Sequence, residues 1–76
     1  MSQVNVVENY RVYPLRGRFI IPVPAGIGEA LATHLRSLGV ACRVRRREGV
    51  PGERVRVEQG EVDPKVLQTL VDHWTQ

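Results

Sequence analysis

The chain has 76 residues, of which 42% are apolar and 25% charged, and its formal net charge is +3 at pH 7. The length excludes two independent cores, and the composition excludes an intrinsically disordered chain. No apolar run approaches the roughly 18 residues of a membrane-spanning helix, and residues 1–7 lack the basic cluster and apolar stretch of a signal peptide. We therefore expect a cytoplasmic protein with an N-terminal extension or edge segment over residues 1–9 and one α+β domain over residues 10–76.

Two strands are predicted close to the N-terminus. Residues 10–15 alternate, with Tyr10 and Val12 on one side, which is typical of a strand. The apolar run over residues 18–23 lies between turn-forming glycine and proline residues and predicts a buried strand. Pro22 within this run favours an edge or a bulge, because proline has no N–H to donate to a neighbouring strand.

The clearest helix is predicted over residues 27–38. Apolar residues recur there at helical spacing, and Gly39 follows at the position where many helices end in a left-handed residue. These apolar residues are Ile27, Leu31, Leu35 and Leu38.

A second helix is predicted from Asp63 and Pro64 to about Trp74. Aspartate is a good N-cap, and proline suits the first helical position because an N–H there would have no partner within the helix. An apolar stripe follows at helical spacing, which indicates that one side of the helix packs on the core. The stripe consists of Leu67, Leu70, Val71 and Trp74.

Between the two helices, the pattern predicts a hairpin. Residues 40–47 alternate, with valines and Cys42 on one face and arginines on the other. A loop rich in glycine and proline covers residues 48–53, and residues 54–58 form the returning strand with Val55 and Val57 on the apolar side.

The register of this hairpin has an electrostatic consequence. A symmetric loop places Arg47 opposite Arg54 and Arg45 opposite Arg56. Like charges directly opposite each other destabilise a sheet, by a few tenths to about 1 kcal/mol for each pair.

The elements together predict a two-layer α+β sandwich of order ββαββα, with a four-stranded mixed sheet and both helices on one face. A right-handed crossover makes the strands over 18–23 and 40–47 parallel. The strand over 54–58 then lies between them, and the strand over 10–15 pairs with the outer side of 18–23. This order resembles a circularly permuted ferredoxin-like fold, an architecture that hosts many functions and implies none. The expected core residues are Leu31, Leu35, Val44, Val55, Val57, Leu70 and Trp74.

The hairpin carries most of the positive charge, because residues 43–56 contain six arginines and only two glutamates. Guanidinium groups on an open sheet face, with Tyr10 or Tyr13 beside them, suit phosphate pairing and base stacking on single-stranded nucleic acid. The aromatic residues typical of RNA-binding sheets are absent, and a solvated charged face that discourages aggregation is the alternative. Both interpretations stay open. The candidate residues for binding an anion or a partner are Arg43, Arg45, Arg47, Arg54 and Arg56.

Residues 24–28 lie between a predicted strand and the start of a predicted helix, where free backbone N–H groups can bind an anion. The segment contains Gly26 and Gly28 but lacks the third glycine of a dinucleotide-binding fingerprint and the lysine of a phosphate-binding loop. An ordinary turn is the preferred interpretation.

The sequence shows no residue set for catalysis or metal binding. The candidate nucleophile, bases and ligands are Cys42, His34 and His73, and their spacing matches no zinc pattern. Cys42 belongs on the valine face of its strand, where a thiol packs as an inert group. The glutamates near the arginines most simply neutralise them. We therefore expect no enzymatic activity, no cofactor and no metal.

These features favour a small non-enzymatic binding or interaction module that is accessory to a larger complex. The alternative is a nucleic-acid-binding domain that uses the arginine-rich sheet face. The expected partner is another protein or an anionic macromolecule such as nucleic acid, and not a membrane. Residues 4–7 are largely apolar and have no assigned place, so we expect them to extend a sheet edge or to pair with a second copy in a homodimer.

Overall fold

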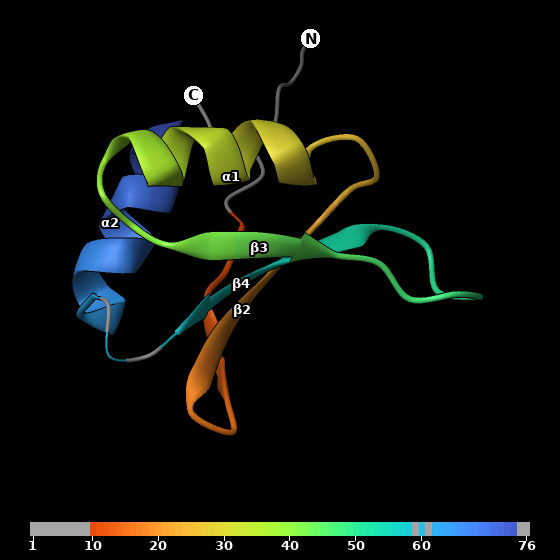
Figure 1. Ribbon diagram of the computed structural model, residues 1–76, viewed down its shortest axis with the longest axis horizontal. Helices are drawn as coiled ribbons and strands as arrows, with labels where there is room; N and C mark the ends of the chain where they lie inside the picture. Colours follow the sequence, from red (N-terminus) through yellow and green to blue (C-terminus); the bar gives the residue numbers. More distant parts are fainter. Residues whose placement is uncertain (1–9, 59, 61, 75–76) are drawn as a thin grey trace, which may run out of the picture.

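The computed structural model describes residues 10–58, 60 and 62–74. This part of the chain forms a small α+β domain with a four-stranded antiparallel sheet and two helices (Figure 1). Residues 4–7, for which we expect an edge or a second copy, lie outside the described residues. The elements in chain order are β1 (Tyr13–Leu15), β2 (Arg18–Val23), α1 (Gly28–Ser37), β3 (Cys42–Arg45), β4 (Glu53–Glu58) and α2 (Pro64–Trp74).

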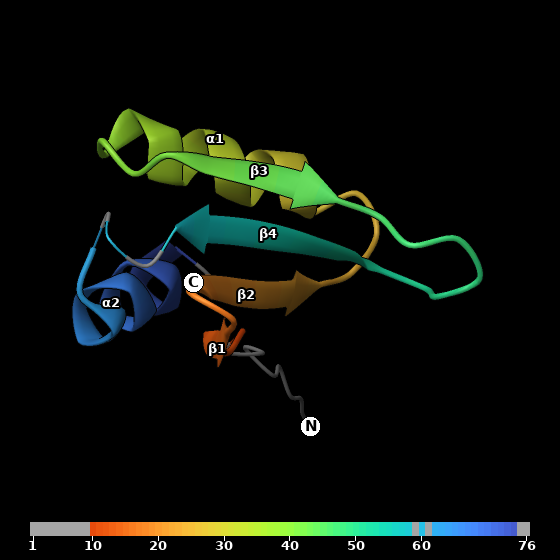
Figure 2. The same cartoon turned by 60° about the horizontal axis from the view of Figure 1, so that its bottom comes forward.

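The strand order in the sheet is β1-β2-β4-β3, and every neighbouring pair is antiparallel. The prediction of a mixed sheet is therefore wrong. The strands β2 and β3 are parallel to each other, as a crossover through α1 implies, but β4 lies between them and is antiparallel to both (Figure 2). A tight turn joins β1 to β2, so this pair is antiparallel as well.

The first strand is shorter than the alternation predicts. Arg16 and Gly17, whose φ angles are 51° and 79°, form the two-residue hairpin turn between β1 and β2. Ahead of β1, the side chain of Gln68 in α2 binds the backbone in place of a strand. Its Oε1 accepts a hydrogen bond from the Val12 N–H at 2.9 Å, and its Nε2 donates one to the Tyr10 carbonyl oxygen at 2.9 Å. Residues 10–12 are therefore bound to α2.

Both helices cover the same face of the sheet. Leu31 and Leu35 of α1 and Leu67 and Val71 of α2 are fully buried against the strands. The buried apolar cluster is Phe19, Ile21, Val23, Leu31, Ala32, Leu35, Val40, Cys42, Val55, Val57, Leu67 and Val71. Of the expected core residues, Val44, Leu70 and Trp74 are only partly buried and pack against this cluster.

The helix ends follow the local signals in the sequence. Gly39 has a φ of +88°, and its N–H donates to the carbonyl oxygen of Arg36, while the N–H of Val40 donates to that of Leu35. This pair of hydrogen bonds ends α1 in a Schellman motif. Leu38, predicted within the apolar stripe, follows the helix and is half exposed.

The start of α2 is also as predicted. The Oδ1 of Asp63 accepts a hydrogen bond from the Lys65 N–H at 2.8 Å, which is the N-cap interaction. Pro64 is the first helical residue.

The register of the β3–β4 hairpin differs from the symmetric prediction by two residues, since Arg43 pairs with Arg56 and Arg45 with Arg54. Two like-charge pairs persist. A shift of two residues leaves every side chain on its predicted face, because the side-chain period of a strand is two.

Candidate functional site: the open face of the sheet

The helices leave the other face of the sheet without a covering element in the part of the chain that the structure describes. The strand registers place ten side chains on this surface, which we call the open face. They are Tyr13, Leu15, Arg18, Ile20, Pro22, Arg43, Arg45, Arg54, Arg56 and Glu58.

One row of four side chains crosses the whole open face. Tyr13 pairs with Ile20, Ile20 with Arg56, and Arg56 with Arg43. The row spans about 14 Å, because neighbouring strands lie roughly 4.8 Å apart. It begins with an aromatic ring on β1 and ends with two guanidinium groups on β4 and β3, so it joins an apolar half of the open face to a cationic half.

A second row extends the cationic half. Pro22 pairs with Arg54, and Arg54 pairs with Arg45. The like-charge pairs of the two rows therefore lie beside each other on β3 and β4. In a pleated strand, side chains two residues apart on one face are neighbours, so the four arginines form a compact group.

Within the described residues, no ion pair joins these four arginines to a carboxylate. Arg18 and Glu58 form the ion pair of the open face, with Nε and Oε2 3.4 Å apart and side chains that are 44% and 65% exposed. Solvent weakens an ion pair so exposed. The open face thus holds five arginines and one glutamate.

The crowding of charge affects Arg56. Partial burial lowers the pKa of the Arg56 guanidinium, and the nearby charges of Arg18 and Arg45 lower it further, while Glu58 opposes them. An anion bound to this group would remove the repulsion.

Two hollows flank the guanidinium groups of the open face. The larger, of about 400 Å³, is lined by arginines of three strands, by Ala41 and Cys42, and by Glu58. The smaller, of about 140 Å³, is lined by Leu15 and Ile20 together with arginines. Ile20 is only 8% exposed although no helix covers it. The exposed apolar surface directly beside the charges is that of Leu15, which is 50% exposed.

The structure brings together four of the five arginines expected to bind a partner: Arg43, Arg45, Arg54 and Arg56. Arg47 follows β3 in the connecting loop and is exposed outside the sheet. Of the two candidate aromatic residues, Tyr13 lies on the open face, whereas Tyr10 packs against the core.

Sequence reasoning missed Arg18 and Ile20. Both lie in the apolar run over residues 18–23, which predicts a strand with both faces buried. The run therefore does not indicate which of its residues lie on the open face. The alternation of β4 supplies that signal once β2 is placed beside it, because each open-face residue of β4 then has a β2 neighbour on the same face: Arg18 beside Glu58 and Ile20 beside Arg56.

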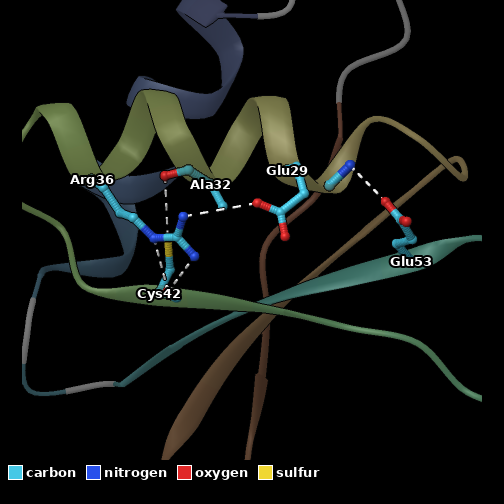
Figure 3. Close-up of polar contacts among 6 residues, drawn as sticks. Glu29, Ala32, Arg36, Cys42 and Glu53 are labelled. Atoms are coloured by element: carbon cyan, nitrogen blue, oxygen red, sulfur yellow. Dashed lines mark hydrogen bonds and ion pairs between the residues drawn. The ribbon is translucent and has the colours of Figure 1, made fainter.

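The N-terminus of α1 already binds an anionic group, the carboxylate of Glu53 (Figure 3). Its Oε1 accepts a hydrogen bond from the Gly28 N–H at 2.8 Å, and its Oε2 accepts one from Arg46 Nε at 2.8 Å. The side chain is 2% exposed. The Gly28 N–H lowers the pKa of the Glu53 carboxyl most, and burial opposes this effect. Residues 24–28 are therefore a turn closed by the chain's own carboxylate.

The contacts of Glu53 also fit the observed register of the hairpin. It begins β4 on the helix-covered face, where it pairs with Val23. Arg46 directly follows β3, and the ion pair between Arg46 Nη2 and Glu53 Oε2 measures 2.8 Å. The prediction that glutamates neutralise arginines is thus confirmed here, but Glu53 acts within the fold and is not part of a solvated surface.

Cys42 is a packing residue, as expected. Its Sγ donates to the Ala32 carbonyl oxygen at 3.6 Å, and burial raises the pKa of the thiol. The Arg36 guanidinium donates to the Cys42 carbonyl oxygen from Nε at 3.3 Å and from Nη2 at 3.1 Å (Figure 3). Because β3 is an edge strand, this contact covers one of its exposed backbone groups.

The remaining candidate residues do not converge on a site. The rings of His34 in α1 and Trp74 in α2 lie 6.1 Å apart between their centres, at the contact of the two helices. No group of three or more histidine, cysteine or acidic residues is placed to hold a metal ion among the residues described. None of the helices in this part of the chain has the length and apolar character needed to cross a membrane.

Comparisons with protein-family models, with curated proteins and with solved structures found no match to this chain.

Proposed function

We propose that this protein is a non-enzymatic binding module and that the open face of its sheet binds an anionic macromolecule. The observation that carries the proposal is the group of four arginines on β3 and β4, arranged as two adjacent like-charge pairs with no carboxylate partner in the described residues. A polyanion laid across the open face would neutralise both pairs at once.

The like-charge pairs favour a bound anion over a solvated surface. Each like-charge pair costs the free protein a few tenths to about 1 kcal/mol. A planar guanidinium donates two parallel hydrogen bonds to a phosphate or carboxylate, which suits charge-assisted binding.

The position of β4 argues against protection from aggregation as the main role of these residues. Charged residues protect a sheet when they lie on an exposed edge strand. That argument applies to Arg43 and Arg45 on the edge strand β3, but Arg54 and Arg56 belong to a strand with a neighbour on each side. Central positions need no such protection.

Retention on immobilised heparin, a sulfated polyanion, tests this proposal. The variants Arg56→Gln and Lys65→Gln each lose one positive charge, but Lys65 lies in α2, away from the open face. We expect Arg56→Gln to elute at clearly lower salt than the parent, and Lys65→Gln to elute close to it. Equal elution of the two variants, or a parent that is not retained at roughly 50 mM salt, would contradict the proposal.

We also propose that the fold is a circularly permuted ferredoxin-like arrangement, in which β1 takes the place of a strand that would otherwise follow α2. The strand order β1-β2-β4-β3 supports this assignment. A chain in which residues 10–16 are moved behind α2 through a flexible linker should fold with the same β1–β2 pairing. Loss of that pairing in an otherwise folded protein would argue against the permutation.

A further inference from the structure

We infer that the anionic partner is a single-stranded nucleic acid, with phosphates on the arginines of β3 and β4 and a base on Tyr13 of β1. This inference rests on the proposed function, because it names the chemical class of partner for the same open face. It goes beyond charge by using the apolar half of that face, which a simple polyanion would leave empty.

The side chains of the row that crosses the open face change from aromatic at β1 to cationic at β4 and β3. Tyr13 is 51% exposed, and its neighbour across the strands, Ile20, lies between it and Arg56. A ligand that extends along this row from the guanidinium groups therefore meets an exposed aromatic ring within about 14 Å. The matching ligand carries negative charge at one end of this row and a planar apolar group at the other.

Only one form of nucleic acid exposes both features. In a duplex the base faces are stacked inside, and a protein meets phosphates and groove edges. In a single strand the bases are unstacked and can lie on tyrosine rings or on guanidinium planes while the phosphates pair with arginines. The open face supplies both kinds of group from adjacent strands, since Tyr13 belongs to β1 and Arg56 to β4.

The surroundings of the Tyr13 ring also favour a nucleobase. Leu15 lies two residues further along β1, is 50% exposed, and lines the hollow of about 140 Å³ with Ile20 and the arginines. A nucleobase stacked on Tyr13 would cover part of this exposed apolar surface, and burial of apolar surface is favourable. An acidic peptide would satisfy the charges but supplies no regularly spaced planar group for this region.

Fluorescence anisotropy with three labelled probes separates these ligands. The probes are a single-stranded oligonucleotide, the same length of strand with abasic sites, and a polyglutamate chain of equal charge. We expect the parent protein to bind the intact strand about tenfold more tightly than the abasic strand, which is the range of one stacked base. Polyglutamate should bind no better than the abasic strand.

Substitution at Tyr13 supplies the matched control. Tyr13→Ala should weaken binding of the intact strand about tenfold and leave binding of the abasic strand unchanged. Tyr13→Phe keeps the ring and should bind like the parent. Because Tyr13 is half exposed, we expect both variants to fold, and the comparison of intact and abasic strands in the parent stands without any variant.

The outcomes distinguish this inference from the proposed function. If all three probes bind equally and Arg56→Gln weakens each of them, the open face binds polyanions and the inference of nucleic acid is wrong. Tighter binding of polyglutamate than of the intact strand would identify an acidic protein as the partner and would also overturn the inference. If no probe binds at roughly 50 mM salt, the proposed function itself fails.

Discussion

The two faces of one sheet differ more in chemistry than any two elements of this protein. Along β4, Val55 and Val57 are fully buried under the helices, whereas Arg54 and Arg56 alternate with them and lie on the open face. The same six-residue strand therefore contributes stability through one set of side chains and charge through the other. Strand alternation places the two sets on opposite faces. Substitutions on the covered face should therefore leave the charge of the open face intact, and substitutions on the open face should leave stability largely intact.

The largest effect should come from the covered face. Leu35→Ala removes a fully buried side chain of α1 and should lower the free energy of unfolding by about 2–5 kcal/mol. Leu70→Ala, at a partly buried position of α2, should cost less than Leu35→Ala. Urea denaturation of the two variants checks this order, and an equal loss at both positions would mean that the covered face extends further than the structure shows.

The contact between α1 and β4 should give the next largest effect. A Cβ on Gly28 would lie 2.5 Å from Glu53 Oε1 and 2.9 Å from Val44 Cγ1, so Gly28→Ala has to displace the buried carboxylate. We expect its melting temperature to fall by on the order of 5 °C. Gly60→Ala is the control, because a Cβ there meets no atom of the described residues within 4 Å. A Gly28→Ala variant as stable as the control would refute the close contact.

The pH dependence of stability should report the contribution of the Glu53 carboxylate. Since folding lowers the pKa of Glu53, the unfolded chain binds more protons near pH 4, and stability falls as the pH drops through this range. Above the usual carboxyl range, the contribution of Glu53 is fully present. We expect the difference in stability between the parent and Glu53→Gln to shrink on acidification. Thermal melts of both proteins between about pH 7 and pH 3 measure this difference. A difference that grows toward low pH would contradict a lowered pKa of Glu53 in the folded protein.

The smallest effect should come from the open face. Arg45→Gln removes one like-charge pair with Arg54 and should raise stability by a few tenths of a kcal/mol at low salt. Added salt should erase this gain, because it screens the repulsion in the parent. Melts of both proteins at two salt concentrations show the effect; destabilisation at low salt would mean that Arg45 has a favourable contact in the fold.

The features that the sequence predicted correctly depend on local signals. Gly39 ends α1, and Asp63 begins α2, because capping requires only neighbouring residues. The alternation of Val55 and Val57 with arginines likewise assigned the covered face before any partner strand was known.

The features that sequence reasoning missed depend on residues far apart in the chain. In the observed hairpin register, Glu53 forms an ion pair with Arg46, and its carboxylate is also bound by the Gly28 N–H 25 positions earlier in the chain. Ahead of the short strand β1, Gln68 binds the backbone of Val12 across 56 positions. Neither contact has a local pattern. The candidate site was predicted from β3 and β4, but its apolar half on β1 and β2 required the strand order.

Binding of a single-stranded nucleic acid by the open-face arginines is tested most directly by an NMR titration. The titration follows the Nε–H resonances of the arginines while a single-stranded oligonucleotide is added. Binding at the open face predicts shifts at Arg43, Arg45, Arg54 and Arg56. It also predicts unchanged resonances for Arg36 and Arg46, which form hydrogen bonds with Cys42 and Glu53. Shifts confined to Arg36, Arg46 or Arg47, or no shifts at low salt, would contradict it.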